Sequence, residues 1–184
     1  GAPGQAGAAG PAGPAGPAGA NGDGTNVVGG ETLTGGQADG FLKFDGVAGE
    51  STDPAHPQEI DVKAFSFGGK NTPGAAGGGG GAGKVALDDV KFSKLYDASS
   101  PKLLQLLATG QHVASATFSF RRPGPNGAQF LTYKLSDVVV TGYDQGGVKE
   151  RPLLEQVALN FSKVDVSYTP AGGGNPITAG VNLK

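Results

Sequence analysis

The stretch "GGGGGAGKV" carries most of the pattern with which backbone amides and a lysine hold phosphate groups. Gly78 is followed, after four residues, by Gly83 and Lys84, as G-x-x-x-x-G-K requires. The next position needs a Ser or Thr hydroxyl for magnesium, and Val85 has none. The following "VALDDVKF" alternates like a strand, whereas a phosphate loop leads into a helix. Nucleotide binding through residues 78–84 therefore stays a remote alternative, and we expect no cofactor.

A second group of polar residues has the composition of an oxygen-rich metal site. In "ESTDPAHPQE", the side chains of Glu50, Asp53, His56 and Glu59 recur every three residues. Two prolines in the same stretch exclude the helix that would bring these side chains to one face. We therefore predict a surface loop and no metal site.

The other charged residues suggest structural positions rather than catalysis. His112 follows the end of a predicted helix, where its charge would favour the helix C-terminus. Arg121 and Arg122 precede Pro-Gly and are expected to be solvated or interface charges. Four aspartates are interpreted as strand-end or turn residues: Asp88, Asp89, Asp97 and Asp137. No Ser, His and Asp set suits a nucleophile, so we predict no catalytic residue and no enzyme.

Composition narrows the class of protein further. The chain has 184 residues, no cysteine and a net charge of -2, which argues against thiolate chemistry and against a basic surface for nucleic acid. No apolar run approaches the roughly 20 residues that span a bilayer, so no membrane insertion is expected. The 35 glycines cluster at the N-terminus, at 68–83 and at 172–174.

Residues 1–24 repeat glycine at every third position. The repeated glycines are Gly1, Gly4, Gly7, Gly10, Gly13, Gly16, Gly19 and Gly22, and Pro11, Pro14 and Pro17 fill the middle of three consecutive triplets. This is the G-X-Y period of collagen, in which only glycine fits at the crowded axis. We predict a collagen-like segment at 1–24, as a triple helix or as a single polyproline II strap on a neighbouring subunit. A flexible linker is the alternative.

The middle of the chain is predicted to be β-rich with one helix. After a linker at 25–38, a domain at 39–170 begins with "FLKFDGV". Its segment "EIDVKAFSFG" is expected to place Ile60, Val62 and Ala64 on one face. Residues 84–96 are expected to be extended, with a bulge or kink near Asp88-Asp89.

The segment "SSPKLLQLLATG", residues 99–110, predicts the helix. Ser99 or Ser100 would cap it, Pro101 fits its first turn, and Gly110 supplies a left-handed stop. Four leucines are expected to form its apolar face: Leu103, Leu104, Leu106 and Leu107.

Longer strands are predicted after the helix. "HVASATFSFRRP" would place Ala114, Ala116, Phe118 and Phe120 on one side, and the "PNG" that follows predicts a hairpin turn. Residues 128–147 and 153–170 continue as strands, the latter with a bulge at Ser162–Lys163. Apolar residues on a second face are interpreted as surface reserved for neighbours: Leu135, Val138 and Val140. The tail at 171–184 carries a possible added strand, from Ile177 to Leu183.

Five motifs follow one another along the chain: "FLKFDGVAGEST", "IDVKAFSFG", "GGGAGKVALDDVKFSKLYDASSPKLLQLLATGQHVASATFSFRR", "LTYKLSDVVVTGY" and "EQVALNFSKVDVSY". In this order they resemble the Hcp family, the haemolysin-coregulated tube proteins of type VI secretion systems. The resemblance covers about residues 39–169. It implies a small antiparallel β-barrel of two sheets with one short α-helix, in six-membered rings that stack into a tube. The collagen-like head and the tail "NPITAGVNLK" depart from that pattern.

In the family a long loop between early strands packs on the neighbouring subunit, and here that position is residues 66–85. We therefore expect the subunit interface to include Gly68, Gly69, Lys70, Asn71, Thr72, Pro73, Gly77, Gly78, Gly79, Gly80, Gly81, Gly83 and Lys84. Glycines there would lie close against another backbone without side-chain clashes.

Assembly is the function that these observations favour. The first interpretation is a secreted, structural protein whose rings, hexameric by resemblance, stack into a tube or an extracellular filament. The alternative is a true type VI tube component with a collagen-like decoration, cytoplasmic until secretion and carrying effector proteins in its lumen. The expected partner is the chain itself in both cases.

Overall fold

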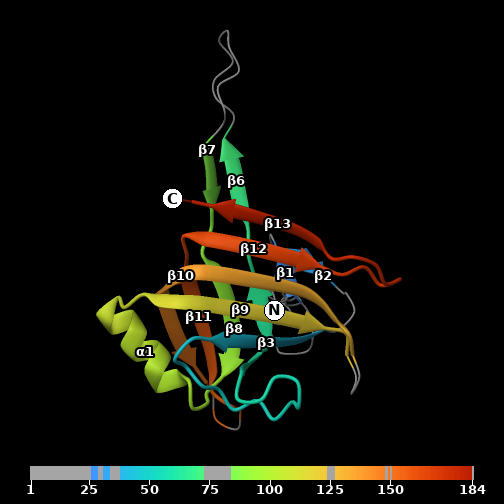
Figure 1. Cartoon of the computed structure of the whole chain (residues 1–184). Helices are drawn as coiled ribbons and strands as arrows, with labels where there is room; N and C mark the ends of the chain where they lie inside the picture. Colours follow the sequence, from blue (N-terminus) through green and yellow to red (C-terminus); the bar gives the residue numbers. More distant parts are fainter. Residues whose placement is uncertain are drawn as a thin grey trace, which may run out of the picture.

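The structure is a computed structural model that describes residues 26–28, 31–33, 38–72, 84–123, 127–147, 149 and 151–183. In this part of the chain thirteen strands and one helix follow one another (Figure 1). They are β1 (Asn26–Val28), β2 (Glu31–Leu33), β3 (Asp39–Phe44), β4 (Ile60–Val62), β5 (Ala64–Ser66), β6 (Gly69–Thr72), β7 (Lys84–Leu87), β8 (Val90–Leu95), α1 (Ser100–Thr109), β9 (Val113–Arg121), β10 (Gln129–Gly146), β11 (Leu154–Asn160), β12 (Lys163–Tyr168) and β13 (Ile177–Asn182). The collagen-like head at 1–24 and the loop at 73–83 lie outside the described residues.

One long strand, β10, belongs to two antiparallel sheets. Its first half pairs with β9 on one side and with β12 on the other, and its second half pairs with β11. Between the halves, Asp137 takes a left-handed φ of 53°. Within the second half, the register against β11 shifts between Val140 and Gly142. Such irregularities bend a strand, which lets one strand run from the first sheet into the second.

The first sheet runs β4-β3-β9-β10-β12-β13, and the second runs β10-β11-β8-β5. Together with the single helix this confirms the predicted mainly β fold of two sheets. The hydrogen-bonded path of the described strands does not close into a full barrel, because it ends at β4 and β5. These two strands follow each other in the chain and are joined by Lys63, whose N–H donates to the Ser93 carbonyl at 2.8 Å.

The core lies between the inner faces of the two sheets and under the helix. Its buried residues are Leu42, Phe44, Val47, Ile60, Val90, Phe92, Leu103, Leu106, Val113, Ala116, Phe118, Leu135, Val138, Val140, Val157, Leu159, Phe161 and Val164. Aromatic rings extend it toward β5, where Phe65 packs edge-on against Phe118 and Phe120 at 5.0 Å between centroids. Burial of this apolar surface drives folding at about 25 cal/mol per Å².

Several predicted faces differ from the observed ones. Leu135, Val138 and Val140 are core residues rather than surface kept for neighbours, because the bend in β10 turns all three inward. Ala64 is exposed, because the chain passes from one sheet to the other at Lys63 and its alternation restarts there. Ala114, at the start of β9, is likewise exposed.

Other predicted elements occur where the sequence placed them. The chain leaves its strands at Asp88-Asp89, between β7 and β8. The strand predicted at 153–170 with a bulge at Ser162–Lys163 is instead two strands, β11 and β12, which end and begin on either side of 161–162 and pair with different halves of β10. β9 and β10 form an antiparallel hairpin, although most of the predicted "PNG" turn lies outside the described residues. The predicted tail strand is β13, which here pairs with β12 of its own chain.

The helix has the predicted bounds but a narrower buried face. Pro101 lies in its first turn, and Gly110 ends it with a φ of 62°. Leu103 and Leu106 are buried, whereas Leu104 is 50% exposed. The helix packs mainly on β10, so Leu103 and Leu106, three residues apart, are covered and Leu104 between them is not.

This difference gives a test of the helix packing. Leu103→Ala should lower the free energy of unfolding by about 2–5 kcal/mol, because it leaves a cavity under the helix. Leu104→Ala is the matched control and should change it by less than about 0.5 kcal/mol. Urea unfolding followed by circular dichroism measures both, and equal losses would contradict the observed helix orientation.

Candidate assembly surfaces and the buried polar network

The predicted interface segment forms a two-stranded ribbon. β6 and β7 pair antiparallel, Gly69 with Leu87 and Thr72 with Lys84, and they pair with no strand of the first or the second sheet. Figure 1 shows this ribbon projecting beyond β13. At its base the Asp88 N–H donates to the Gly68 carbonyl at 2.9 Å. We call β6 and β7 the arm.

The described interface residues lie on the surface of the arm. Gly68, Gly69, Lys70 and Asn71 are exposed, and 51% of Val85 is exposed. The other predicted interface residues are Thr72 and Lys84, at the ends of β6 and β7, and Pro73, Gly77, Gly78, Gly79, Gly80, Gly81 and Gly83, which lie outside the described residues.

Glycine at position 69 is explained by a contact within the chain. A Cβ atom there would lie 2.7 Å from Leu87 Cδ2 and 3.0 Å from the Ala86 carbonyl oxygen. This glycine therefore permits close pairing of β6 with β7. The expectation that the arm glycines serve a neighbouring subunit remains a prediction.

Lys84 of the phosphate-loop pattern is followed by a strand and not by a helix. Lys84 is the first residue of strand β7, and α1 begins only at Ser100. A helix N-terminus facing the ligand is what gives a phosphate loop its electrostatic attraction.

The four residues with metal-site spacing are directed to different partners. Glu50 accepts the Ala98 N–H at 3.1 Å, Asp53 pairs with Arg121, and His56 Nδ1 lies 2.9 Å from Glu59 Oε2. Among the residues that the structure describes, no three acidic or histidine side chains are grouped so as to hold a metal ion.

Arg121 lies in an intramolecular cluster and is not a solvated charge. Its Nη2 is 2.5 Å from Asp53 Oδ2, its Nε donates to Asp39 Oδ2 at 3.2 Å, and its guanidinium lies 5.1 Å from the centre of the Phe41 ring. The His56 ring stacks on the same Phe41 ring, with 4.2 Å between the two ring centroids. The cluster fixes the loop that precedes β4 onto the first sheet.

The environment of Asp53 lowers the pKa of its carboxyl. Partial desolvation acts to raise this pKa, but the hydrogen bond from the Ala55 N–H and the positive charge of Arg121 outweigh it. His112, expected at the helix C-terminus, instead places Nδ1 2.6 Å from Asp137 Oδ1.

Sequence reasoning did not identify a charged pair inside the protein. Lys94 of β8 and Glu155 of β11 are opposite each other in adjacent strands, and both side chains have 0% exposure. They continue inward-facing rows of alternate residues that include Phe92 and Val157. Two charges of opposite sign at the inward positions of two predicted strands are the signal that would have found them.

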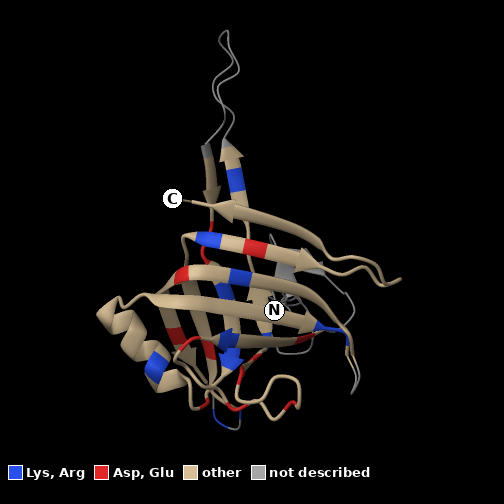
Figure 2. Ribbon diagram, viewed as in Figure 1, with Lys and Arg blue, Asp and Glu red and all other residues tan. Residues whose placement is uncertain are grey.

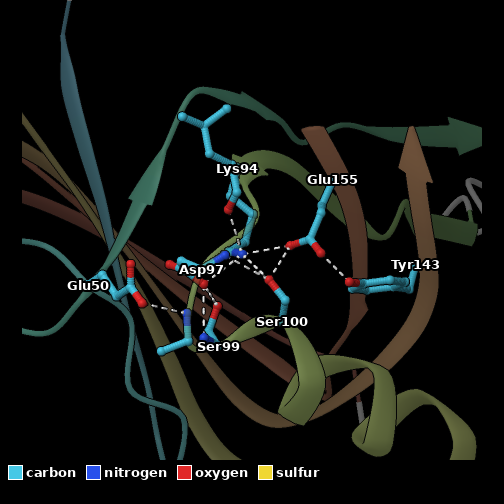
Figure 3. Close-up of polar contacts among 9 residues, drawn as sticks. Glu50, Lys94, Asp97, Ser99, Ser100, Tyr143 and Glu155 are labelled. Atoms are coloured by element: carbon cyan, nitrogen blue, oxygen red, sulfur yellow. Dashed lines mark hydrogen bonds and ion pairs between the residues drawn. The ribbon is translucent and has the colours of Figure 1, made fainter. Parts of the chain in front are cut away.

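Lys94 is surrounded by acceptors from three segments (Figure 3). Its Nζ donates to Glu155 Oε2 at 2.6 Å, to Ser100 Oγ at 2.9 Å and to the Leu95 carbonyl at 2.8 Å, and it lies 2.8 Å from Asp97 Oδ1. The ammonium group therefore has every proton satisfied, which is what makes a buried charge tolerable.

The same network fixes the start of the helix. Ser100 Oγ donates to Glu155 Oε2 at 2.8 Å and accepts the Asp97 N–H at 3.0 Å. Ser99 occupies the cap position, but its hydroxyl donates to Asp97 and does not cap the helix. The Tyr143 hydroxyl donates to the second oxygen of Glu155, and burial together with this carboxylate raises the pKa of Tyr143.

The two sheets and the helix α1, which we call the body, contain this network, and most of the body matches a known protein family. The family model described as "Type VI secretion system effector, Hcp" matches residues 41–168. The chain belongs to the Hcp family. It is 39% identical over 154 residues to "Protein hcp1" of Pseudomonas aeruginosa, covering 79% of this chain and 95% of that protein.

Solved Hcp structures have the same fold. The crystal structure of Hcp1 from Salmonella typhimurium has a TM-score of 0.69 at 32% identity, covering 79% of this chain and 95% of its own. A type VI secretion system effector from Yersinia pestis has a TM-score of 0.68 at 29% identity, covering 78% and 99%. These matches extend beyond residues 41–168. In the described part of the chain, no helix is long and apolar enough to cross a membrane.

The buried pair predicts a specific pattern of stabilities. Lys94→Met or Glu155→Leu alone should cost about 3–5 kcal/mol, because each leaves the partner charge buried without its counterion. The double variant should cost less than the sum of the two single changes. Lys163→Met, which breaks an exposed pair with Asp165, is the control and should cost less than about 1 kcal/mol. Additive losses in urea unfolding would contradict this coupling.

Asp53 predicts a dependence of stability on pH. Because its pKa is lower in the folded state, its carboxylate contributes stability above its unfolded pKa of about 3.9, and this is lost as pH falls through the folded pKa. The destabilisation caused by Asp53→Asn should therefore be larger near pH ~7 than near pH ~3. Unfolding curves at the two pH values measure it, and a difference independent of pH would count against the Arg121 contact.

Proposed function

We propose that this chain is a self-assembling structural protein whose subunits form rings that stack into a tube. Proteins of the Hcp family form stacked hexameric rings that make the inner tube of type VI secretion systems. The observation that carries the proposal is the match of residues 41–168, which contain the helix and both sheets except the start of β3 and the last strand β13, to that family.

The arm supports the proposal as the element that bridges subunits. A two-stranded ribbon without further packing is marginally stable in water, so it gains most from a second surface. Residues 69–71, Val85 and Ala86 of the arm are exposed, and the arm contacts its own body at the base, where Leu87 packs against the core. Residues 68–72 and 84, with the loop between them, are our proposed subunit interface.

Two forms of the assembly remain as proposals. In the first, the tube is a secreted, extracellular filament, and the collagen-like residues 1–24 strengthen it between subunits. In the second, it is a type VI tube that carries effector proteins in its lumen. The role is structural rather than enzymatic in both, and the collagen-like head distinguishes them.

Electron microscopy of the purified full-length chain tests the proposal. We expect rings with a central opening, and stacks of rings at higher protein concentration. A variant in which residues 69–87 are replaced by a short Gly-Ser linker should keep the body folded but lose the stacks or the rings, because the bridging element is gone. A chain that stays monomeric by light scattering at all concentrations would overturn the proposed function.

Deletion of residues 1–24 separates the two forms. Shorter or less stable filaments than those of the full chain would favour the extracellular filament. Unchanged tubes would leave the head a decoration and favour the type VI tube.

A further inference from the structure

The outer edge of β13 is an open hydrogen-bonding surface. β13 is the last strand of the first sheet and pairs only with β12 among the described strands. The Leu183 N–H donates to the Ser162 carbonyl at 2.8 Å, and in an antiparallel ladder the residues that point to the partner alternate. The backbone N–H and C=O groups of Thr178 and Gly180 therefore point away from β12.

The composition of β13 is unusual for an edge strand. Proteins usually protect such edges with charged side chains, an internal proline or a bulge, because an open edge pairs with other chains. β13 has the sequence ITAGVN, which carries no charge (Figure 2). Its register with β12 is regular, and all six residues are exposed. This edge is therefore suited to receive another strand.

The inner face of β13 is apolar as well. Ile177, Ala179 and Val181 stand opposite Tyr168, Val166 and Val164, so they continue the row that enters the core. Ile177 is 64% exposed, Val181 is 41% exposed and Tyr168 is 42% exposed. The second sheet ends before it covers them, so burial of this strip would add to the stability of any strand pairing there.

Ring symmetry limits which element covers this edge. A ring of more than two identical subunits needs a contact between two different surfaces, because pairing of one edge with itself closes a dimer. A β13 edge that takes part in such a ring contact therefore meets a different element of the next copy. Among the described strands, the arm is a two-stranded sheet of its own and has open edges to offer.

We propose that the outer edge of β13 receives the arm of a second copy by strand addition. This inference rests on the proposed function and names the surface that the arm contacts. β6 and β7 have four residues each and β13 has six, so the lengths permit pairing. β13 carries no charge to oppose Lys70 of the arm, so no like charges meet. Strand addition takes its affinity from main-chain hydrogen bonds and its specificity from alternate side chains.

A proline at an outward-pointing position tests the hydrogen bonds directly. Thr178→Pro removes a donor from the outer edge and leaves the bonds to β12, since proline is tolerated where the N–H faces outward. We expect the concentration needed for assembly to rise about tenfold or more. Thr178→Val is the matched control, because it changes the side chain but keeps the donor, and it should assemble like the unaltered chain.

Cysteine crosslinking gives a second measurement that does not depend on the proline variant folding. The chain has no cysteine, so single introduced thiols are unambiguous. Chains with Lys70→Cys and chains with Thr178→Cys are mixed, assembled and treated with a short bismaleimide. We expect a crosslinked heterodimer, which only contact between two copies can produce. Ala108→Cys, exposed on α1, replaces Thr178→Cys in the control and should give none.

The outcomes separate this inference from the proposed function. Suppose that the unaltered chain forms rings. Normal assembly of Thr178→Pro, or absence of the crosslink between positions 70 and 178, would then overturn the β13 contact but not ring formation. Failure of the unaltered chain to assemble would overturn the proposed function itself. Loss of assembly in Thr178→Pro with retained circular dichroism and the specific crosslink would support the inference.

Discussion

A fully buried lysine is the constraint on which the rest of the body depends. An ammonium group without water needs acceptors for all its protons, and Lys94 finds them on β11, on its own strand and on the turn into α1. Each of these segments must therefore be in place before the charge is tolerable. The network joins the second sheet to the helix with polar geometry that apolar packing alone would not specify.

The body and the arm are stabilised in different ways. The body has a continuous core between two sheets, and its buried polar side chains are hydrogen-bonded in the part of the chain that the structure describes. The arm is a ribbon of eight paired residues, of which residues 69–71, Val85 and Ala86 are exposed. This division matches the proposed function, in which the arm completes its hydrogen bonds on another copy of the chain.

Local sequence signals predicted the elements better than the faces they bury. Proline in the first turn and a left-handed Gly110 located α1, since both act through the backbone. The same leucine-rich pattern did not show that Leu104 is exposed, because that depends on which face of α1 packs against β10. Likewise, Leu135, Val138 and Val140 could not be placed inside before the bend at Asp137 was known.

The contacts that were not predicted from the sequence join polar residues that lie far apart in the chain. Arg121 was expected to be a solvated or interface charge, but its partners Asp39 and Asp53 lie far before it in the chain and reach it only through the β3–β9 pairing. Lys94 and Glu155 were overlooked because charged residues in strands ordinarily point outward. The family resemblance predicted the two-sheet fold, and it says nothing about these side-chain contacts.

The sharing of β10 between the two sheets has a mechanical consequence. A tensile load applied at β13 passes through β12 into β10, and from β10 it is divided between β9 in one sheet and β11 in the other. When the load runs along the strands, these antiparallel ladders are sheared, and their hydrogen bonds must break together instead of one after another. The body is thus built to carry force as a single unit, so a stretched assembly should yield between subunits before a subunit unravels.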